Sequence, residues 1–251
     1  MEKDIKGVEL SGKVVIPPSK SDGQRAILCA GLSAGKSIIY NVGQSNDELA
    51  MIRNIQQFGA KVEIRENEIE VDGSINFPKN AEFNCGESGL GLRLMTSICA
   101  VFDGNHSLTG EGSILNRSQS FFNEEFPKMG LEVESNNGFL PITLNGHLNP
   151  GIYKVDGSQS SQYISGLLMA LPLLKSDSEL IIEDLRSKPY IDMTLSTLAS
   201  FGIEIRVEGN KYIIQGNQFY TPTNYKVEND WSSASCWLAA AALGQKIELS
   251  G

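Results

Sequence analysis

A threefold internal repeat constrains the fold of this chain more than any other feature of its sequence. Each repeat contains a helical stretch that ends in Phe or Met followed by Gly, and then two short alternating runs closed by a second Gly. The first glycines, Gly59, Gly130 and Gly202, are 71 and 72 residues apart. Gly commonly ends helices, but spacing this regular is typical of repeated structural units. Equivalent positions in the repeats should therefore become equivalent positions in space.

Each repeat is expected to fold as helix, strand, helix and two-stranded hairpin, because apolar residues recur first with helical and then with alternating spacing. The predicted helices span residues 25–32, 47–58, 90–101, from about 117, 161–174 and 191–200. The predicted strands include residues 37–40, 61–64, 68–71 and 179–183. Asn136-Asn137-Gly138 is typical of a hairpin turn with positive φ. The fold class is therefore α/β (α+β), with three units around a shared core.

The repeats account for residues 17–225, which we expect to form one domain. Residues 1–16 are expected to supply a lead-in strand, and residues 226–251 a helix at 232–243 and a strand at 246–249. We interpret 1–16 and 226–251 as fragments of a second, truncated domain. A chain of 251 residues with 41% hydrophobic residues can bury one large core or two modest ones.

Composition argues against several classes of partner. The net charge of −9 disfavours a nucleic-acid surface, which needs clustered Lys and Arg. The amino terminus is charged, and the longest apolar stretches are shorter than a membrane span. We therefore expect a cytoplasmic protein that binds neither nucleic acid nor membrane, and any anion must be held by local groups.

The cysteines and histidines give no sign of a metal or redox site. No Cys-x-x-Cys spacing occurs among Cys29, Cys85, Cys99 and Cys236, so they are expected to be reduced, mostly buried thiols. His106 and His147 both follow residues typical of turns and are expected on the surface.

The starts of the second helices are candidates for an anion site. Asp47, Ser118 and Tyr190 each stand twelve residues before a repeated glycine. Helix amino termini have unpaired N–H groups and a positive partial charge, so three of them together would attract phosphate or carboxylate. Arg117 and Ser187 lie beside them in sequence. The alternative, that Asp47, Ser118 and Ser187 only cap helices, stays open at this point.

The starts of the first helices add polar and Gly-rich motifs. One brings a Lys, hydroxyls and an Arg into a turn, one is rich in glycine, and one supplies several Ser and Gln donors. These motifs are Pro17-Pro18-Ser19-Lys20-Ser21-Asp22-Gly23-Gln24-Arg25, Cys85-Gly86-Glu87-Ser88-Gly89-Leu90-Gly91-Leu92-Arg93 and Gly157-Ser158-Gln159-Ser160-Ser161-Gln162. None has the spacing of a nucleotide-binding loop.

Taken together, these motifs resemble the 5-enolpyruvylshikimate-3-phosphate synthase (3-phosphoshikimate 1-carboxyvinyltransferase) family, in which they occur in the same order. The most specific of them is Ser187-Lys188-Pro189-Tyr190-Ile191-Asp192; the others include Thr109-Gly110-Glu111 with Arg117, Ser160-Ser161-Gln162-Tyr163 and Val227-Glu228-Asn229-Asp230. The resemblance implies the inside-out α/β barrel of the enolpyruvyl transferases, in which two similar domains each bury the helices of three units inside sheets. It also implies that the second domain is largely absent from these 251 residues.

The resemblance implies transfer of the enolpyruvyl group of phosphoenolpyruvate to the 5-hydroxyl of shikimate 3-phosphate, by addition and then elimination of phosphate. This reaction belongs to the shikimate pathway of aromatic amino acid biosynthesis and needs no metal or redox cofactor. Since the family completes its site with a second domain, this chain alone is expected to be inactive. The full-length protein is expected to be a monomer.

The resemblance also implies roles for individual residues. The carboxylate of shikimate 3-phosphate would be bound by Ser21 and Arg25, and its ring would lie against Tyr190. Its phosphate would be surrounded by Ser160, Ser161, Gln162 and Ser187. Phosphoenolpyruvate would be bound by Lys20, Gly89, Arg117 and again Gln162, with Lys20 also assisting proton transfer as a catalytic residue.

The chain departs from the family pattern at five positions, and two alternatives remain open. The family usually has Gly where this chain has Pro18, Asn where it has Gln24, and an acidic residue where it has Asn46. It usually has Asn where this chain has Glu87, and Thr where it has Leu90. A sister enzyme that acts on UDP-N-acetylglucosamine typically has a reactive Cys in the loop that corresponds to residues 112–117, and this chain has none there. A non-catalytic anion-binding module of the same fold is the second alternative.

Overall fold

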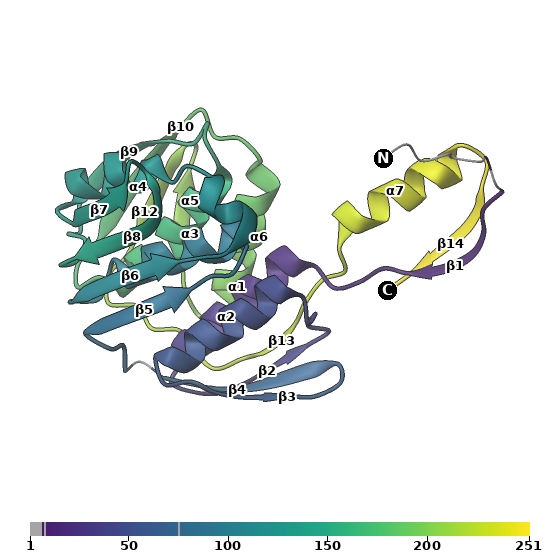
Figure 1. Cartoon of the computed structure of the whole chain (residues 1–251), viewed down its shortest axis with the longest axis horizontal. Coiled ribbons are helices and arrows are strands. Elements are labelled where there is room, and N and C mark those ends of the chain that lie inside the picture. The colour runs from purple at the N-terminus through teal and green to yellow at the C-terminus, as the bar shows by residue number, and fades with distance from the viewer. Residues whose placement is uncertain (1–6, 8, 75) are drawn as a thin grey trace.

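The computed structural model describes residue 7, residues 9–74 and residues 76–251. In this part of the chain the strands form three four-stranded sheets and one separate pair of strands (Figure 1). Each four-stranded sheet belongs to one repeat and combines a parallel edge strand, a strand that lies between the two helices in sequence, and a hairpin. The repeat seen in the sequence is therefore a repeat in structure.

The three sheets share one strand order. The first sheet is ordered β13 (Asn224–Lys226), β2 (Gly35–Tyr40), β4 (Glu68–Gly73) and β3 (Lys61–Ile64). The second is ordered β5 (Asn80–Asn84), β6 (Asn105–Thr109), β8 (Phe139–Asn145) and β7 (Glu132–Asn136). The third is ordered β9 (Ile152–Asp156), β10 (Ser178–Glu183), β12 (Lys211–Ile214) and β11 (Ile205–Glu208). The first unit thus takes its edge strand from the far end of the repeats.

The first helix of each unit lies in the core. These helices are α1 (Lys20–Leu32), α3 (Gly89–Cys99) and α5 (Ser161–Ala170), and nearly all their residues are buried. The second helices, α2 (Asn46–Gln57), α4 (Ser120–Glu125) and α6 (Lys188–Ser200), are more exposed. The 3-10 segments η1 (Gly112–Asn116) and η2 (Phe126–Met129) flank α4, and η3 (Leu171–Leu173) extends α5. Helices enclosed by sheets confirm the expected fold class, although the three sheets stay separate.

Several element boundaries differ from those expected. Helix α1 begins five residues earlier than predicted, because the side chain of Ser19 caps it by accepting the Asp22 N–H. Helix α6 begins at Lys188, where Pro189 suits a first turn. Helix α4 begins at Ser120 rather than near residue 117. The predicted turn at residues 136–138 is confirmed, since Asn137 and Gly138 have φ of 51° and 81°.

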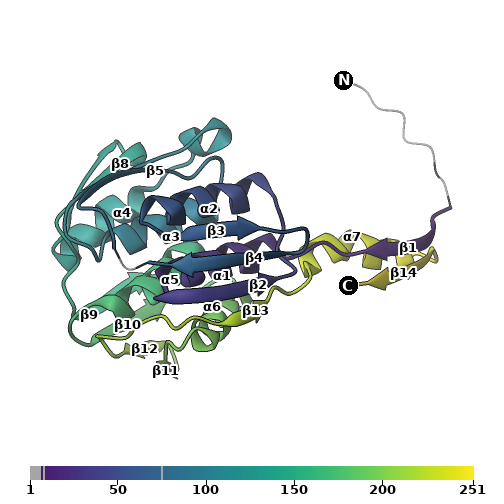
Figure 2. The ribbon, with the colours of Figure 1, turned by 90° about the horizontal axis from the view of Figure 1, so that it is seen from below.

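A small substructure lies apart from the repeats in both views (Figures 1 and 2). It contains β1 (Ser11–Val15), which pairs in parallel with β14 (Lys246–Ser250), and helix α7 (Trp231–Ala242). Part of the lead-in strand expected at 1–16 lies outside the described residues. Strand β13 continues through the boundary expected at residue 225.

Two antiparallel segments connect this substructure to the repeats. The Ser19 N–H donates to the Glu228 carbonyl at 2.8 Å, and the Asp230 N–H donates to the Pro17 carbonyl at 2.9 Å.

No helix in the described residues combines the length and apolar character needed to cross a bilayer.

The structure corrects the expectation for one histidine. His106 lies inside β6 and is fully buried, with its ring edge-on to Phe77 at 5.3 Å between centroids. The expectation of a surface position failed because Asn105, a residue typical of turns, begins β6 here and His106 is buried within that strand. Among the cysteines, Cys29, Cys85 and Cys99 are buried and Cys236 is exposed, and all four are free thiols.

Candidate functional site

Seven of the predicted site residues line one cavity of about 380 Å³. They come from the amino-terminal parts of α1, α5 and α6 and the segments that precede the last two. The seven are Ser21, Arg25, Ser160, Ser161, Gln162, Ser187 and Tyr190. The cavity is also lined by Leu90 and by three residues without a predicted individual role, Ser158, Gln159 and Arg186. Helix starts and hydroxyl groups thus converge on one polar space.

The start of α5 forms one wall of the cavity. Ser160 caps this helix, since its hydroxyl oxygen accepts the Gln162 N–H at 3.3 Å. The preceding segment packs closely on the one that leads into α6, because a Cβ on Gly157 would lie 2.9 Å from the Leu185 Cα. Gly at this position therefore brings the two Ser-bearing segments together.

Arg25 lies at the base of the cavity and is 1% exposed. Its guanidinium donates to the Thr194 hydroxyl at 2.8 Å, the Ser21 carbonyl at 2.6 Å and the Ser165 hydroxyl at 3.2 Å. Burial lowers the Arg25 pKa to about 10, while Asp22 opposes this shift. The group therefore stays charged near neutral pH, and its direct partners are uncharged oxygens. A buried cation in this state favours an anionic ligand.

Ser187 precedes α6 in an unusual backbone conformation. Its φ of 55° lies in the left-handed region, which costs non-glycine residues about 1–3 kcal/mol. Its hydroxyl makes no capping bond to the helix. The side chain is thus left available to a ligand in the cavity.

The structure separates the three helix starts that the sequence grouped together. Asp47 does not cap α2, since Ser45 does so with Glu48 in a capping box. Ser118 lies before α4, where its hydroxyl oxygen accepts the Ser120 N–H at 3.2 Å. Of the trio, Tyr190 lines the cavity. The starts of the three second helices therefore do not line one cavity, and the first helices α1 and α5 supply most of the lining around Tyr190.

Gly89 and Arg117 adjoin the cavity beside Gln162. A Cβ on Gly89 would lie 3.6 Å from Arg117 Nη1 and 3.8 Å from Gln162 Oε1. The amide oxygen of Gln162 also accepts from Arg93, whose guanidinium stacks on the Tyr163 ring at 4.5 Å. This network fixes the orientation of Gln162 between the two parts of the site.

Lys20 lies on the other side of Ser21 and Tyr190. Its ammonium pairs with the Asp47 carboxylate at 2.9 Å. It lines a neighbouring cavity of about 740 Å³ that reaches Trp231 at the start of α7. Ser21 and Tyr190 line both cavities, so Lys20 borders the site without lining the space that holds the other seven residues.

Two departures from the family pattern have structural partners. Gln24 is buried and accepts the Ser88 hydroxyl at 2.6 Å, which ties α1 to the cap of α3. The Glu87 carboxylate accepts the Ser113 N–H at 2.9 Å, and this hydrogen bond lowers the Glu87 pKa. Glu87 thereby anchors the segment that precedes Arg117.

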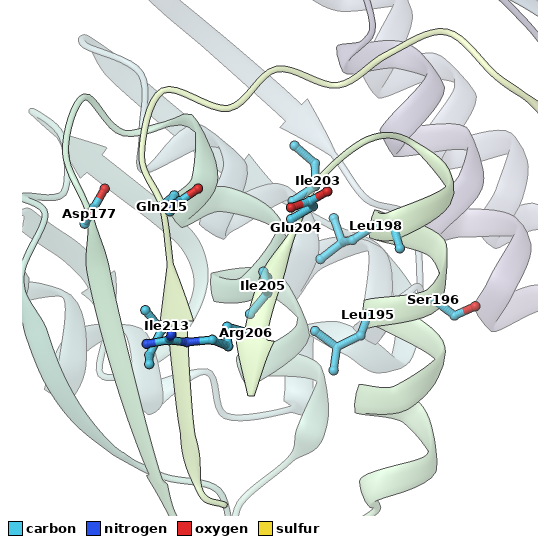
Figure 3. A pocket seen from close by; sticks show the side chains of 11 residues that line it. Asp177, Leu195, Ser196, Leu198, Ile203, Glu204, Ile205, Arg206, Ile213 and Gln215 are labelled. Carbon is cyan, nitrogen blue, oxygen red and sulfur yellow. The ribbon is translucent and has the colours of Figure 1, made fainter. Parts of the chain in front are cut away.

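A larger cavity, of about 870 Å³, lies between α6 and the β11–β12 hairpin. Figure 3 shows Leu195 and Leu198 of α6 directed toward Ile205 of β11. Its cation, Arg206, pairs with Glu208 at 3.2 Å. The mainly aliphatic walls suit an anion poorly, so we assign the site to the smaller cavity.

The smaller cavity combines two arginines, several hydroxyls and the start of α5. Such donors suit a small ligand with carboxylate and phosphate groups. In the described part of the chain no group of three or more His, Cys, Asp or Glu residues could hold a metal ion. Sequence reasoning missed Arg186, whereas Ser158 and Gln159 lie inside the quoted Gly157–Gln162 motif but had no individual role.

Fold and cavity together define an α/β protein with three repeated units and a polar, arginine-containing cavity at the starts of its helices. A family model described as EPSP synthase (3-phosphoshikimate 1-carboxyvinyltransferase) matches residues 5–251. The chain belongs to this family.

Relatives and solved structures agree with this assignment. Proteins named 3-phosphoshikimate 1-carboxyvinyltransferase from Clostridium beijerinckii and Clostridioides difficile are each 40% identical, over 96% of this chain and 58% of their own length. An EPSP synthase structure from Acinetobacter baumannii superposes with a TM-score of 0.81 at 24% identity, over 96% of this chain and 55% of that one. The chain thus spans about 58% of the length of the curated relatives it matches.

Proposed function

We propose that the protein transfers the enolpyruvyl group of phosphoenolpyruvate to the 5-hydroxyl of shikimate 3-phosphate. The observation that carries this proposal is the convergence of seven polar or aromatic side chains, drawn from three helix starts, on one cavity. Membership of the EPSP synthase family supports it. A cytoplasmic location and a monomeric full-length state belong to the same proposal.

In this proposal shikimate 3-phosphate occupies the cavity of about 380 Å³. Arg25, with Ser21, binds its carboxylate, since a guanidinium fork matches a planar carboxylate. The hydroxyls of Ser160, Ser161 and Ser187, aided by the start of α5, bind its phosphate. Tyr190, at the mouth shared with the neighbouring cavity, packs against the ring.

Phosphoenolpyruvate binds beside it in this proposal, between Gly89, Arg117, Gln162 and Lys20. The absence of a side chain on Gly89 leaves room for the ligand next to Arg117. Gln162 contacts both ligands and fixes their positions relative to each other. Lys20, on the side of α7, is placed to assist proton transfer once the Asp47 contact is exchanged for ligand.

We further propose that α7 and the β1–β14 pair belong to a second domain that completes the site. The exposed apolar residues Val15, Trp231 and Leu243, which are 71%, 75% and 83% exposed, support this proposal. Closure of two domains would exclude water from both substrates. The 251-residue chain alone should then bind shikimate 3-phosphate without turnover.

The test is release of inorganic phosphate from phosphoenolpyruvate by the complete gene product. Release that depends on shikimate 3-phosphate is the expected result. Equal release with UDP-N-acetylglucosamine would show that the protein has the activity of the sister enzyme instead. No release with either acceptor would favour a non-catalytic binding module. Turnover by the 251-residue chain alone would contradict the role given to a second domain.

A further inference from the structure

Among the roles assigned so far to residues of this chain, one substrate group has no cationic partner, if the proposed function is taken as the basis. Shikimate 3-phosphate has a carboxylate and a phosphate, and Arg25 is assigned to the carboxylate. The groups assigned to the phosphate, Ser160, Ser161, Gln162 and Ser187, are all uncharged. Charge-assisted hydrogen bonds are roughly twice as strong as neutral ones, so a phosphate site of neutral groups alone would be weak.

Arg186 is the second arginine that lines the same cavity. Its backbone N–H faces the Gly157 carbonyl at 3.4 Å, which sets it against the segment that carries Ser158 and Ser160. Its positive charge also helps to lower the pKa of Asp156, after the larger effect of the hydrogen bonds from Ser158. Arg186 therefore lines the cavity on the side of the segment that leads into α5, where the phosphate is expected.

The other cation near Ser187, Lys188, forms an ion pair away from this cavity. The Lys188 ammonium bonds both carboxylate oxygens of Asp192, at 2.6 and 2.8 Å. Lys188 lines a different cavity, with Tyr212 and Gly209. No salt bridge of Arg186 is found in the part of the chain that the structure describes. The two cations on either side of Ser187 thus line different cavities, and it is Arg186 that lines the cavity assigned to the substrate.

We propose that Arg186 binds the phosphate group of shikimate 3-phosphate and, with Arg25 on the carboxylate, fixes the orientation of this substrate. The planar guanidinium can donate two parallel hydrogen bonds to phosphate oxygens. The side chain is exposed in the free protein, so binding orders it over the ligand. The phosphate site then combines one cation with the hydroxyls of the α5 and α6 starts.

The test compares Arg186→Gln with the matched control Lys188→Gln in the complete gene product. Steady-state kinetics give KM for each substrate, and titration calorimetry gives the affinity for shikimate 3-phosphate and for shikimate. We expect Arg186→Gln to raise KM for shikimate 3-phosphate by about tenfold or more, as loss of a charged hydrogen bond does. KM for phosphoenolpyruvate, the affinity for shikimate and all constants of Lys188→Gln should stay within about twofold.

The outcomes separate this inference from the proposed function. If the unmodified protein turns over but Arg186→Gln keeps its KM for shikimate 3-phosphate, the assignment of Arg186 is wrong and the function stands. A rise in KM for phosphoenolpyruvate alone would assign Arg186 to the other phosphate and overturn the inference. Equal losses of affinity for shikimate and for its phosphate would show a general structural effect. If the unmodified protein has no acceptor-dependent activity, the proposed function itself fails.

Discussion

Arg25 is the residue whose surroundings most favour a bound anion. It is buried on α1, and its direct partners are the Thr194 and Ser165 hydroxyls and a carbonyl. We expect Arg25→Ala to weaken binding of shikimate 3-phosphate by roughly 1.5–3 kcal/mol, the usual cost of a lost charged hydrogen bond. Titration calorimetry measures this loss, and Arg65→Ala, on an exposed hairpin, is the control. Unchanged affinity in a folded Arg25→Ala variant would refute the assignment.

His106 predicts a pH dependence of stability. Burial lowers its pKa, so the folded protein favours the neutral ring. In the unfolded chain the histidine takes up a proton near its ordinary pKa of about 6.5. The contribution of the buried neutral ring to the free energy of unfolding is therefore complete above that pH and declines below it. One such proton changes the free energy of unfolding by at most about 1.4 kcal/mol per pH unit.

Urea unfolding between pH 7 and pH 5 tests this expectation. The free energy of unfolding of His106→Phe, which suits the neighbouring Phe77 and Phe83, should fall less steeply with acidification than that of the unmodified protein. His147→Gln, which removes an exposed histidine beside Asp103, is the control for loss of a histidine at the surface. Parallel curves for the unmodified protein and His106→Phe would contradict the prediction.

The residues that line the cavity were predictable where they lie in dense polar motifs. Ser160, Ser161 and Ser187 come from runs whose chemistry suggests anion binding without any structure. Arg186 lies beside one of these runs, but Lys188 is an equally plausible cation in sequence. Which of them faces the cavity depends on how the segment before α6 packs on Gly157, and this contact joins residues distant in the chain. Local pattern does not determine such packing.

At the scale of the element, the residue that precedes α6 combines a strained backbone with a hydroxyl that is assigned to ligand binding. Ser187 adopts φ of 55°, which Gly tolerates better than Ser. We expect Ser187→Gly to raise the free energy of unfolding by about 0.5–1 kcal/mol. The same change removes a hydroxyl assigned to phosphate and should weaken binding of shikimate 3-phosphate several-fold.

Thermal unfolding and calorimetry on Ser187→Gly and Ser187→Ala test both parts. Ser187→Ala removes the hydroxyl and keeps the strain, so it should lose affinity without gaining stability. Ser120→Gly, at the start of α4 and away from the cavity, is the control for the general effect of Gly near a helix start. If Ser187→Gly bound as tightly as the unmodified protein, the hydroxyl would have no role in binding.

Elements were predictable where their signals are local. Helix interiors and hairpins follow from apolar spacing and turn residues, as at Asn137-Gly138. The parallel edge strands β5, β9 and β13 escaped prediction because each is short and pairs with a strand on the far side of a helix or of the whole repeat region. Parallel pairing of this kind leaves little trace in a short stretch of sequence.

At the scale of the whole molecule, the first unit is completed by residues from the end of the repeats. Strand β13 pairs with β2, and the segment after it is held by one buried carboxylate on α1. That carboxylate, on Asp22, accepts the Tyr225 hydroxyl at 2.8 Å, the Glu228 N–H at 3.0 Å and the Thr197 hydroxyl at 3.3 Å. Asp22 thus joins α1, α6 and the segment that leads to α7.

Removal of this carboxylate should loosen the connection between the repeats and α7. Asp22→Ala leaves the donors on Tyr225 and Glu228, in two partly buried hydrogen bonds, without their acceptor, and an unpaired donor costs up to about 1–3 kcal/mol when it is buried. We expect the free energy of unfolding to fall by roughly 2–4 kcal/mol, measured by urea unfolding. Asp103→Ala, which removes an exposed carboxylate paired with His147, should change it by less than about 1 kcal/mol.

Hydrogen exchange locates the effect of Asp22→Ala within the molecule. If Asp22 acts as the tether, amide protection should drop most in β13 and the residues up to Glu228, while β5 to β8 of the second unit keep theirs. The Glu228 N–H is the direct reporter, because its acceptor is the carboxylate that is removed. A uniform loss of protection in all three units would mean that Asp22 stabilises the shared core rather than the connection. Since α1 also carries Ser21 and Arg25, a tether at Asp22 would link the position of α7 to the cavity of about 380 Å³ that these two residues line.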